Sequence, residues 1–171
     1  MDSAELAANF SDVTAANRAY AHSFTLGGLS PQAARGLGVL TCIDSRIDPL
    51  ATLGLRPGDA KILRNAGGRA TPDAVRSLIM ATHLLNVSRI LVMPHTRCAA
   101  GSSEDVDVRR SILEHSGVDT GDYVFHATSD QLRSLRADLE VLRNEPLLAK
   151  GVEVAGAIYD VDTGLLSDLV V

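Results

Sequence analysis

Short apolar runs alternate with amphipathic stretches along most of the chain, separated by Gly, Pro, Asn or Asp residues. The runs are rich in Val, Ile and Leu, which is typical of strands that are buried on both faces of a parallel sheet. They lie at residues 36–42 (GLGVLTC), 60–66 (AKILRNA), 88–95 (SRILVMPH) and 123–127 (YVFHA). Residues 152–171 instead alternate apolar and polar positions around Asp162-Thr163-Gly164, which predicts an antiparallel hairpin.

Apolar residues recur at helical spacing in four other segments. These segments are residues 3–24, 71–86, 104–117 and 129–143. The second begins with Thr71 as a capping residue and Pro72 in the first turn, which favours a helix start at this point. We interpret residues 1–28 as an N-terminal helical arm, suited to lie on a partner subunit.

This alternation of strands and helices predicts an α/β fold. The expected architecture is a mainly parallel central sheet flanked by helices, with a C-terminal antiparallel hairpin or edge strand. A chain of 171 residues is long enough for one well-filled domain, so residues 1–171 are expected to form a single domain. Ligands of such sheets gather at the C-terminal ends of the strands, and Cys42 and His95 both fall at predicted strand ends.

Composition narrows the possible partners. The formal net charge is −5 and the basic residues form no run, so we expect neither a nucleic-acid partner nor an anionic membrane surface. No apolar run is long enough to span a bilayer, and the acidic N-terminus does not resemble a secretion signal. The sequence therefore predicts a cytoplasmic protein that acts on a small molecule.

Two motifs carry the candidate chemistry. In Cys42-Ile43-Asp44-Ser45-Arg46, an extended chain would point Cys42, Asp44 and Arg46 to one side, although a core cysteine followed by a loop salt bridge would also explain this piece. In His95-Thr96-Arg97-Cys98, a His and a Cys three residues apart can reach one ion as the chain leaves a strand. Two thiolates and one imidazole favour zinc, and three protein ligands leave a fourth position open, as in catalytic sites. The four other histidines are interpreted as helix-surface or core residues: His22, His83, His115 and His126.

The motifs together resemble the β-carbonic anhydrase family. CIDSR matches its CxDxR signature, HTRC matches its HxxC signature, and ILRNAGGR between them looks like its RNAGG loop. The similarity runs from about residue 36 to the end of the chain, where GAIYDVDTGLL looks like the last hairpin of the family.

The resemblance implies a role for each matching residue. Cys42, His95 and Cys98 correspond to the ligands of one Zn²⁺ per chain. Asp44 and Arg46 correspond to the catalytic dyad beside the metal, and Gly67 and Gly68 to the glycines of the loop near the site. The resemblance also implies a homodimer or a higher homo-oligomer, with the N-terminal helices embracing the partner.

The expected reaction is the reversible hydration of CO₂ to bicarbonate by a zinc-bound hydroxide, the activity of a carbonic anhydrase, which is a lyase. Two alternatives remain open at this point: hydrolysis of carbonyl sulfide or CS₂ at the same site, and a catalytically silent zinc-binding protein. Close family members often have Asp and Gly where this chain has Arg97 and Ala99. Arg97 is therefore a candidate residue of the substrate channel or its loop.

Overall fold

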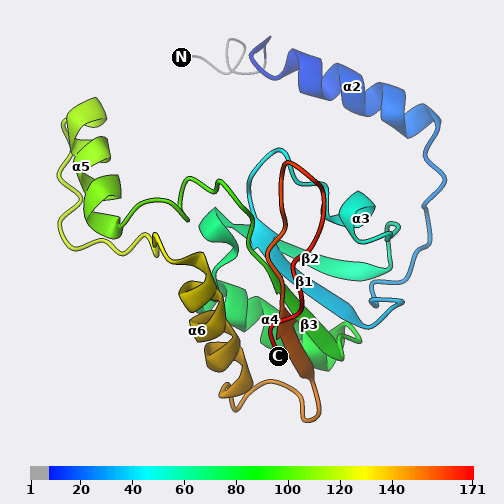
Figure 1. The fold of residues 1–171 in the computed structure, drawn as a ribbon. Helices are drawn as coiled ribbons and strands as arrows, with labels where there is room; N and C mark the ends of the chain where they lie inside the picture. Colours follow the sequence, from blue (N-terminus) through cyan, green and yellow to red (C-terminus); the bar gives the residue numbers. More distant parts are fainter. Residues whose placement is uncertain (1–7) are drawn as a thin grey trace.

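The computed structural model describes residues 8–171, and its centre is a four-stranded parallel sheet (Figure 1). Its strands are β1 (Leu37–Cys42), β2 (Ala60–Asn65), β3 (Arg89–Met93) and β4 (Glu153–Gly156). Their order is β2-β1-β3-β4, and all three neighbouring pairs are parallel. The α/β prediction with a mainly parallel sheet is confirmed, and so are the three apolar strands that precede residue 95.

The described residues form four helices within the predicted segments and two short ones, at residues 49–52 and 66–68, that were not predicted. They are α2 (Ser11–His22), α3 (Pro49–Thr52), η1 (Ala66–Gly68), α4 (Pro72–Leu84), α5 (Asp105–Ser116) and α6 (Gln131–Arg143). The start of α4 follows its predicted local signals, because the Thr71 side chain accepts from the N–H of Ala74 and Pro72 occupies the first turn. Among the described residues, no helix is long and apolar enough to cross a membrane.

Helices α4 and α6 pack on one face of the sheet. Leu40 of β1 and Val92 of β3 contribute to the core on this face, together with Leu78 of α4 and Leu139 of α6, and all four are fully buried. A second cluster contains Val39 and Met93 and extends to the ends of the central strands. The two clusters anchor β1 and β3 from both sides, which makes the ends of these strands a rigid place for a site.

The predicted strand at 123–127 does not form. The N–H groups of Phe125 and Ala127 donate to the Asp105 carboxylate, at 3.0 Å and 2.7 Å, instead of to a neighbouring strand. His126 between them has a φ of 59°, which is incompatible with an extended strand. This prediction was wrong because the first turn of α5 binds the segment.

The C-terminal hairpin is present, but its first arm belongs to the parallel sheet. β4 pairs in parallel with β3, and the chain then turns back on itself. The return is antiparallel and is limited to bridges between Gly156 and Val170 and between Tyr159 and Leu166.

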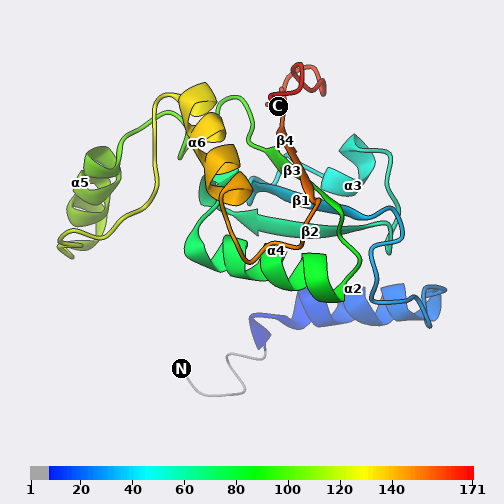
Figure 2. The same ribbon diagram turned by 90° about the horizontal axis from the view of Figure 1, so that it is seen from below.

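The predicted N-terminal arm, residues 1–28, is helical over Ser11–His22. α2 has no buried residue and lies apart from the sheet in both views (Figures 1 and 2). Residues 1–7 of the predicted arm lie outside the described residues.

Candidate metal centre

The two predicted motifs meet at one edge of the sheet. Cys42 is the last residue of β1, and His95 and Cys98 follow β3, its parallel neighbour. Because the carboxyl ends of adjacent parallel strands share an edge, residues more than fifty positions apart converge there. The candidate ligand atoms of Cys42, His95 and Cys98 all lie within 4.8 Å of one another.

These three side chains form a buried donor set. The two sulfur atoms are 3.8 Å apart, and the exposed fractions of Cys42, His95 and Cys98 are 4%, 0% and 3%. Nδ1 of His95 donates to the carbonyl oxygen of Thr96 at 2.9 Å, which leaves Nε2 as the lone-pair nitrogen. Nε2 is buried and has no hydrogen-bond partner. An unsatisfied imidazole nitrogen beside two thiols fits a tetrahedral zinc ion with three protein ligands and one open position.

The protonation of the thiols is unequal. The hydrogen bond from Cys98 lowers the pKa of Cys42 to about 4, assisted by the N–H groups of Asp44 and Gly67. The same hydrogen bond, together with burial, raises the pKa of Cys98. The pair therefore shares one proton at neutral pH and presents one ready thiolate to a cation.

Asp44 and Arg46 form a tight pair beside the donor set. Nε and Nη2 of Arg46 donate to the two carboxylate oxygens of Asp44 at 2.9 Å and 2.7 Å, and the Arg46 backbone N–H adds a third contact at 2.9 Å. Oδ2 of Asp44 lies 3.7 Å from Nε2 of His95. The hydrogen bonds from Arg46 hold the pKa of Asp44 well below its usual range, so the carboxylate stays ionised.

The segment after β1 does not continue as a strand. Ile43 is 61% exposed whereas Ile47 is buried, which does not fit the extended chain that was assumed for residues 42–46. The cause is Arg64 of β2, whose guanidinium donates to the backbone carbonyls of Cys42, Asp44 and Ile47, at 2.8, 2.6 and 3.2 Å. Arg64 bends the chain so that the Asp44 side chain turns towards His95. Sequence reasoning missed this role, although Arg64 stands in the RNAGG-like segment.

The predicted glycine loop touches the donor set through its backbone. Gly67 has a φ of 80° and its N–H donates to Sγ of Cys42 at 3.3 Å. Gly68 has a φ of 67°, and a Cβ at this position would lie 3.0 Å from the carbonyl carbon of Thr41. Both positions therefore require glycine, one for positive φ near the thiol and one for close approach to β1.

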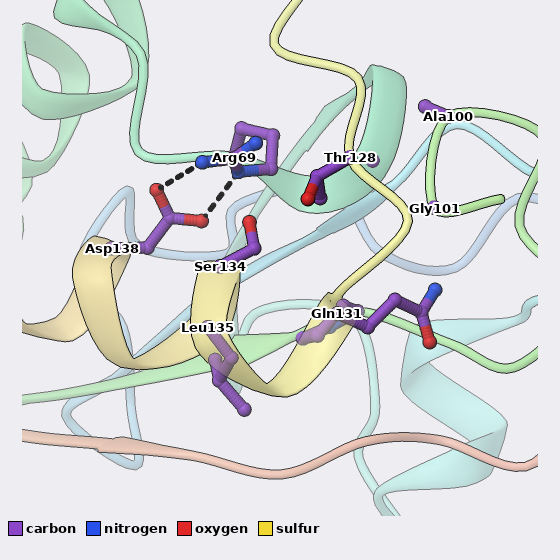
Figure 3. A pocket seen from close by; sticks show the side chains of 10 residues that line it. Arg69, Ala100, Gly101, Thr128, Gln131, Ser134, Leu135 and Asp138 are labelled. Atoms are coloured by element: carbon purple, nitrogen blue, oxygen red, sulfur yellow. Dashed lines mark hydrogen bonds and ion pairs between the residues drawn. The ribbon is translucent and has the colours of Figure 1, made fainter. Parts of the chain in front are cut away.

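A buried ion pair connects the end of the glycine loop to helix α6. Nε of Arg69 donates to Oδ2 of Asp138 in α6 at 2.7 Å, and the two side chains are only 17% and 8% exposed. Figure 3 shows the pair at a small pocket that Gln131 and Ser134 of α6 also line. Gln131 donates to the carbonyl oxygen of His95 at 2.6 Å. Helix α6 thus supports both halves of the site, a function that no local sequence signal indicated.

Asp138→Ala should lower the free energy of unfolding by about 3 kcal/mol, because it leaves the Arg69 charge buried without a partner. Urea denaturation of the zinc-free protein measures this loss. Asp73→Ala is the matched control, since it removes the carboxylate of an exposed pair with Arg76 on α4. Equal losses for the two variants would contradict a structural role of the buried pair.

Arg97 does not direct its charge at the donor set. Its guanidinium forms an ion pair with Asp162 and is 61% exposed, while its carbonyl oxygen accepts from Nη2 of Arg46 at 3.1 Å. Arg97 therefore contacts the Asp44–Arg46 pair with its backbone and not with its charge, and its assignment to the substrate channel or its loop stays a prediction. Ala99 is exposed and contributes no side chain to the donor set.

Comparisons with known proteins show which family the sequence and the fold resemble. The sequence profile of the family described as carbonic anhydrase matches residues 37–120. Beta-carbonic anhydrase 1 of Mycobacterium tuberculosis is 30% identical over 158 residues, covering 92% of this chain and 96% of that protein. A carbon disulfide hydrolase of Saccharolobus solfataricus is 30% identical over 153 residues, covering 75% of this chain and 74% of that protein. The crystal structure of a carbonic anhydrase from Streptococcus mutans superimposes with a TM-score of 0.87 at 38% identity, covering 92% of this chain and 95% of that one.

Proposed function

The chain belongs to the β-carbonic anhydrase family, and on this premise we propose that it binds one zinc ion through Cys42, His95 and Cys98 and hydrates CO₂ reversibly to bicarbonate. One observation carries the proposal. The unpartnered Nε2 of buried His95 converges with two thiol sulfurs, one of which is already acidified. Burying an imidazole nitrogen without a partner is costly unless a cation binds there.

When bound, zinc supplies the Lewis acidity that makes water nucleophilic near neutral pH. The residues around the three candidate ligands fix the orientation of the ligand side chains. The Thr96 carbonyl fixes the tautomer of His95, and the Gly67 N–H donates to the Cys42 sulfur. These outer contacts orient the ligands before any cation arrives.

The proposed catalytic role of Asp44 is to accept a hydrogen bond from the attacking water. Its ionised carboxylate lies beside His95 and can accept a hydrogen bond from the attacking water oxygen, which aims the lone pair of that oxygen at the carbon of CO₂. Arg46 donates hydrogen bonds to both carboxylate oxygens of Asp44, which keeps Asp44 ionised and its side chain oriented towards His95. Arg46 thereby acts through Asp44.

The proposal is tested by measuring zinc content and the CO₂-hydration rate on the same purified sample. We expect about one zinc per chain and a hydration rate that falls when zinc is removed by a chelator and returns when it is restored. Full zinc occupancy without hydration between pH 7 and 9 would instead favour the silent zinc-binding alternative.

Zinc binding at pH 7 should release about one proton from the cysteine pair, because the hydrogen bond between the two sulfurs lowers the pKa of Cys42 and raises that of Cys98, so that the pair together holds one proton. The zinc affinity should accordingly rise by about tenfold per pH unit near neutrality. Calorimetry in buffers of different ionisation enthalpy measures the proton count. An affinity independent of pH would mean that both thiols are ionised before zinc binds.

Hydrolysis of CS₂ or carbonyl sulfide is the second candidate. The match to a carbon disulfide hydrolase favours it, since the identity of 30% equals that of the mycobacterial carbonic anhydrase, although the match covers 75% of this chain and not 92%. Side-by-side assays of CO₂ hydration, carbonyl sulfide hydrolysis and CS₂ hydrolysis separate the two. We expect CO₂ hydration to be the fastest by kcat/KM.

A homodimer is also proposed, with the N-terminal arm on the partner subunit. α2 buries none of its residues in the single chain, and its apolar side chains Val13 and Tyr20 are more than half exposed, as is Phe10 just before it. Such an unpartnered apolar stripe favours a partner surface. Light scattering coupled to gel filtration should give twice the chain mass of 18.1 kDa or a multiple of it.

A further inference from the structure

Arg97 occupies an unusual backbone conformation directly before the candidate ligand Cys98. Its φ is 53°, in the left-handed region that a side chain such as arginine rarely adopts. In this conformation its carbonyl oxygen faces Nη2 of Arg46 at 3.1 Å. Since the left-handed conformation is intrinsically unfavourable here, contacts of Arg97 must stabilise it.

The side chain of Arg97 provides such a contact. Its guanidinium pairs with Asp162, which lies 65 positions later in the C-terminal turn. The Asp160 carboxylate fixes this turn by accepting from the N–H groups of Asp162 and Thr163 at 2.8 Å and 2.9 Å. Asp162 therefore presents its charge from a rigid position.

Thr96 fastens the same turn to the loop that follows β3. Its N–H donates to the carbonyl oxygen of Tyr159 at 2.9 Å, and its hydroxyl oxygen accepts from the N–H of Val161 at 3.1 Å. The turn and the ligand-bearing loop thus form one unit, in which the Arg97–Asp162 pair is the outermost contact.

The other end of this unit is the Asp44–Arg46 pair. Nη2 of Arg46 is shared between Oδ2 of Asp44, at 2.7 Å, and the carbonyl oxygen of Arg97, at 3.1 Å. The Arg46 side chain is 42% exposed, so solvent-facing rotamers compete with the observed one. By accepting this hydrogen bond, the Arg97 carbonyl oxygen favours the Arg46 rotamer that donates to both carboxylate oxygens of Asp44.

We propose that Arg97 and Asp162 are positioning residues, whose ion pair holds the residue-97 carbonyl against Arg46 and so keeps Asp44 in its working orientation. The proposal rests on the proposed function in assigning that orientation to CO₂ hydration. Arg97 touches no reacting atom and acts through Arg46. The competing explanation is an exposed ion pair without effect, because most such pairs contribute little.

The first experiment uses the zinc-loaded chain of 171 residues and its variant Asp162→Asn. We expect kcat to fall about threefold to tenfold with KM and zinc content unchanged. The Arg46 Nε–H should exchange faster with solvent, because its hydrogen bond to Asp44 is weakened. This exchange is measured by ¹⁵N NMR, and the signal is assigned with Arg46→Lys. Asp73→Asn on α4 removes a charge from another exposed pair and should change neither value.

Further variants separate the effect of the backbone conformation of residue 97 from the effect of its ion pair with Asp162. Arg97→Asn lacks the ion pair but tolerates positive φ, so it should retain more activity than Arg97→Ala. Arg97→Asp combined with Asp162→Arg restores an ion pair with reversed charges, and it should recover kcat and Arg46 exchange to within about twofold of the wild type.

Wild-type kcat and wild-type Arg46 exchange in Asp162→Asn would overturn the proposal. Reduced kcat with unchanged Arg46 exchange would overturn it as well, since the effect would not run through Arg46. If the wild-type protein hydrates no CO₂, the proposed function fails, and the exchange measurements alone still decide whether Arg97 and Asp162 position Arg46.

Discussion

Cys42→Ser should lose bound zinc and CO₂ hydration together. The variant removes one of two thiolates from a three-ligand set, and it removes the one whose pKa is lowered to about 4. Serine cannot replace it, because a hydroxyl stays protonated and is a hard, weak zinc ligand. Zinc affinity should fall by at least about a hundredfold, and activity should fall in proportion to zinc content. Metal analysis after dialysis and a hydration assay on the same sample measure both.

Substitutions of two histidines provide a further test of the ligand assignment, with His83 as the matched control for His95. His95→Asn should behave as Cys42→Ser does, whereas His83→Asn should keep zinc, because His83 lies on α4 and contacts the carbonyl oxygen of Leu147. Circular dichroism against the zinc-free wild type separates loss of metal from loss of fold. Full zinc occupancy in both Cys42→Ser and Cys98→Ser would refute the ligand set.

The convergence of Cys42, His95 and Cys98 could be predicted from the sequence because it depends on local patterns and one topological rule. The apolar runs that precede Cys42 and His95 predicted strands, and parallel strands bring their carboxyl ends to one edge of the sheet. The same applies to α4, whose start is encoded by Thr71 and Pro72. Each of these signals lies within a few residues of what it determines.

Contacts between distant residues could not be predicted in this way. YVFHA has the composition of a strand, yet Asp105 binds its backbone from twenty positions earlier. Arg64 and Asp138 support the site from β2 and α6 by contacts with residues up to 69 positions away. A charged residue on a strand or a helix has no pattern that identifies such a partner, so only the fold reveals these roles.

The Asp44–Arg46 pair lies between these two cases. Its members were predicted to face the metal together, on the assumption of an extended chain, but β1 ends at Cys42. The pair forms nonetheless, because the two side chains are close in sequence and Arg64 turns the backbone that carries them. The ion pair is present, as the alternative of a loop salt bridge also allowed, whereas the extended chain assumed for the motif does not form. The catalytic role of the pair stays a prediction.

Asp44→Asn should retain one zinc per chain and lose most of the turnover, with kcat lower by about a hundredfold. Asn preserves the size of the side chain but carries no charge, and one of its two polar atoms is a donor. It can therefore neither hold the bidentate Arg46 fork nor act as an anionic acceptor beside His95. Zinc retention is expected because the three donor atoms are untouched. Steady-state hydration kinetics and metal analysis measure the two quantities.

Arg46→Ala tests whether the two residues act as one unit. Because Arg46 works by keeping Asp44 ionised and oriented, its loss should be similar to or milder than that of Asp44→Asn. The double variant should be little worse than Asp44→Asn alone, since Arg46 has nothing left to orient. Additive losses would mean that Arg46 contacts the reacting groups independently. A wild-type rate in Asp44→Asn would show that the carboxylate, despite its place 3.7 Å from Nε2 of His95, serves the fold and not the reaction.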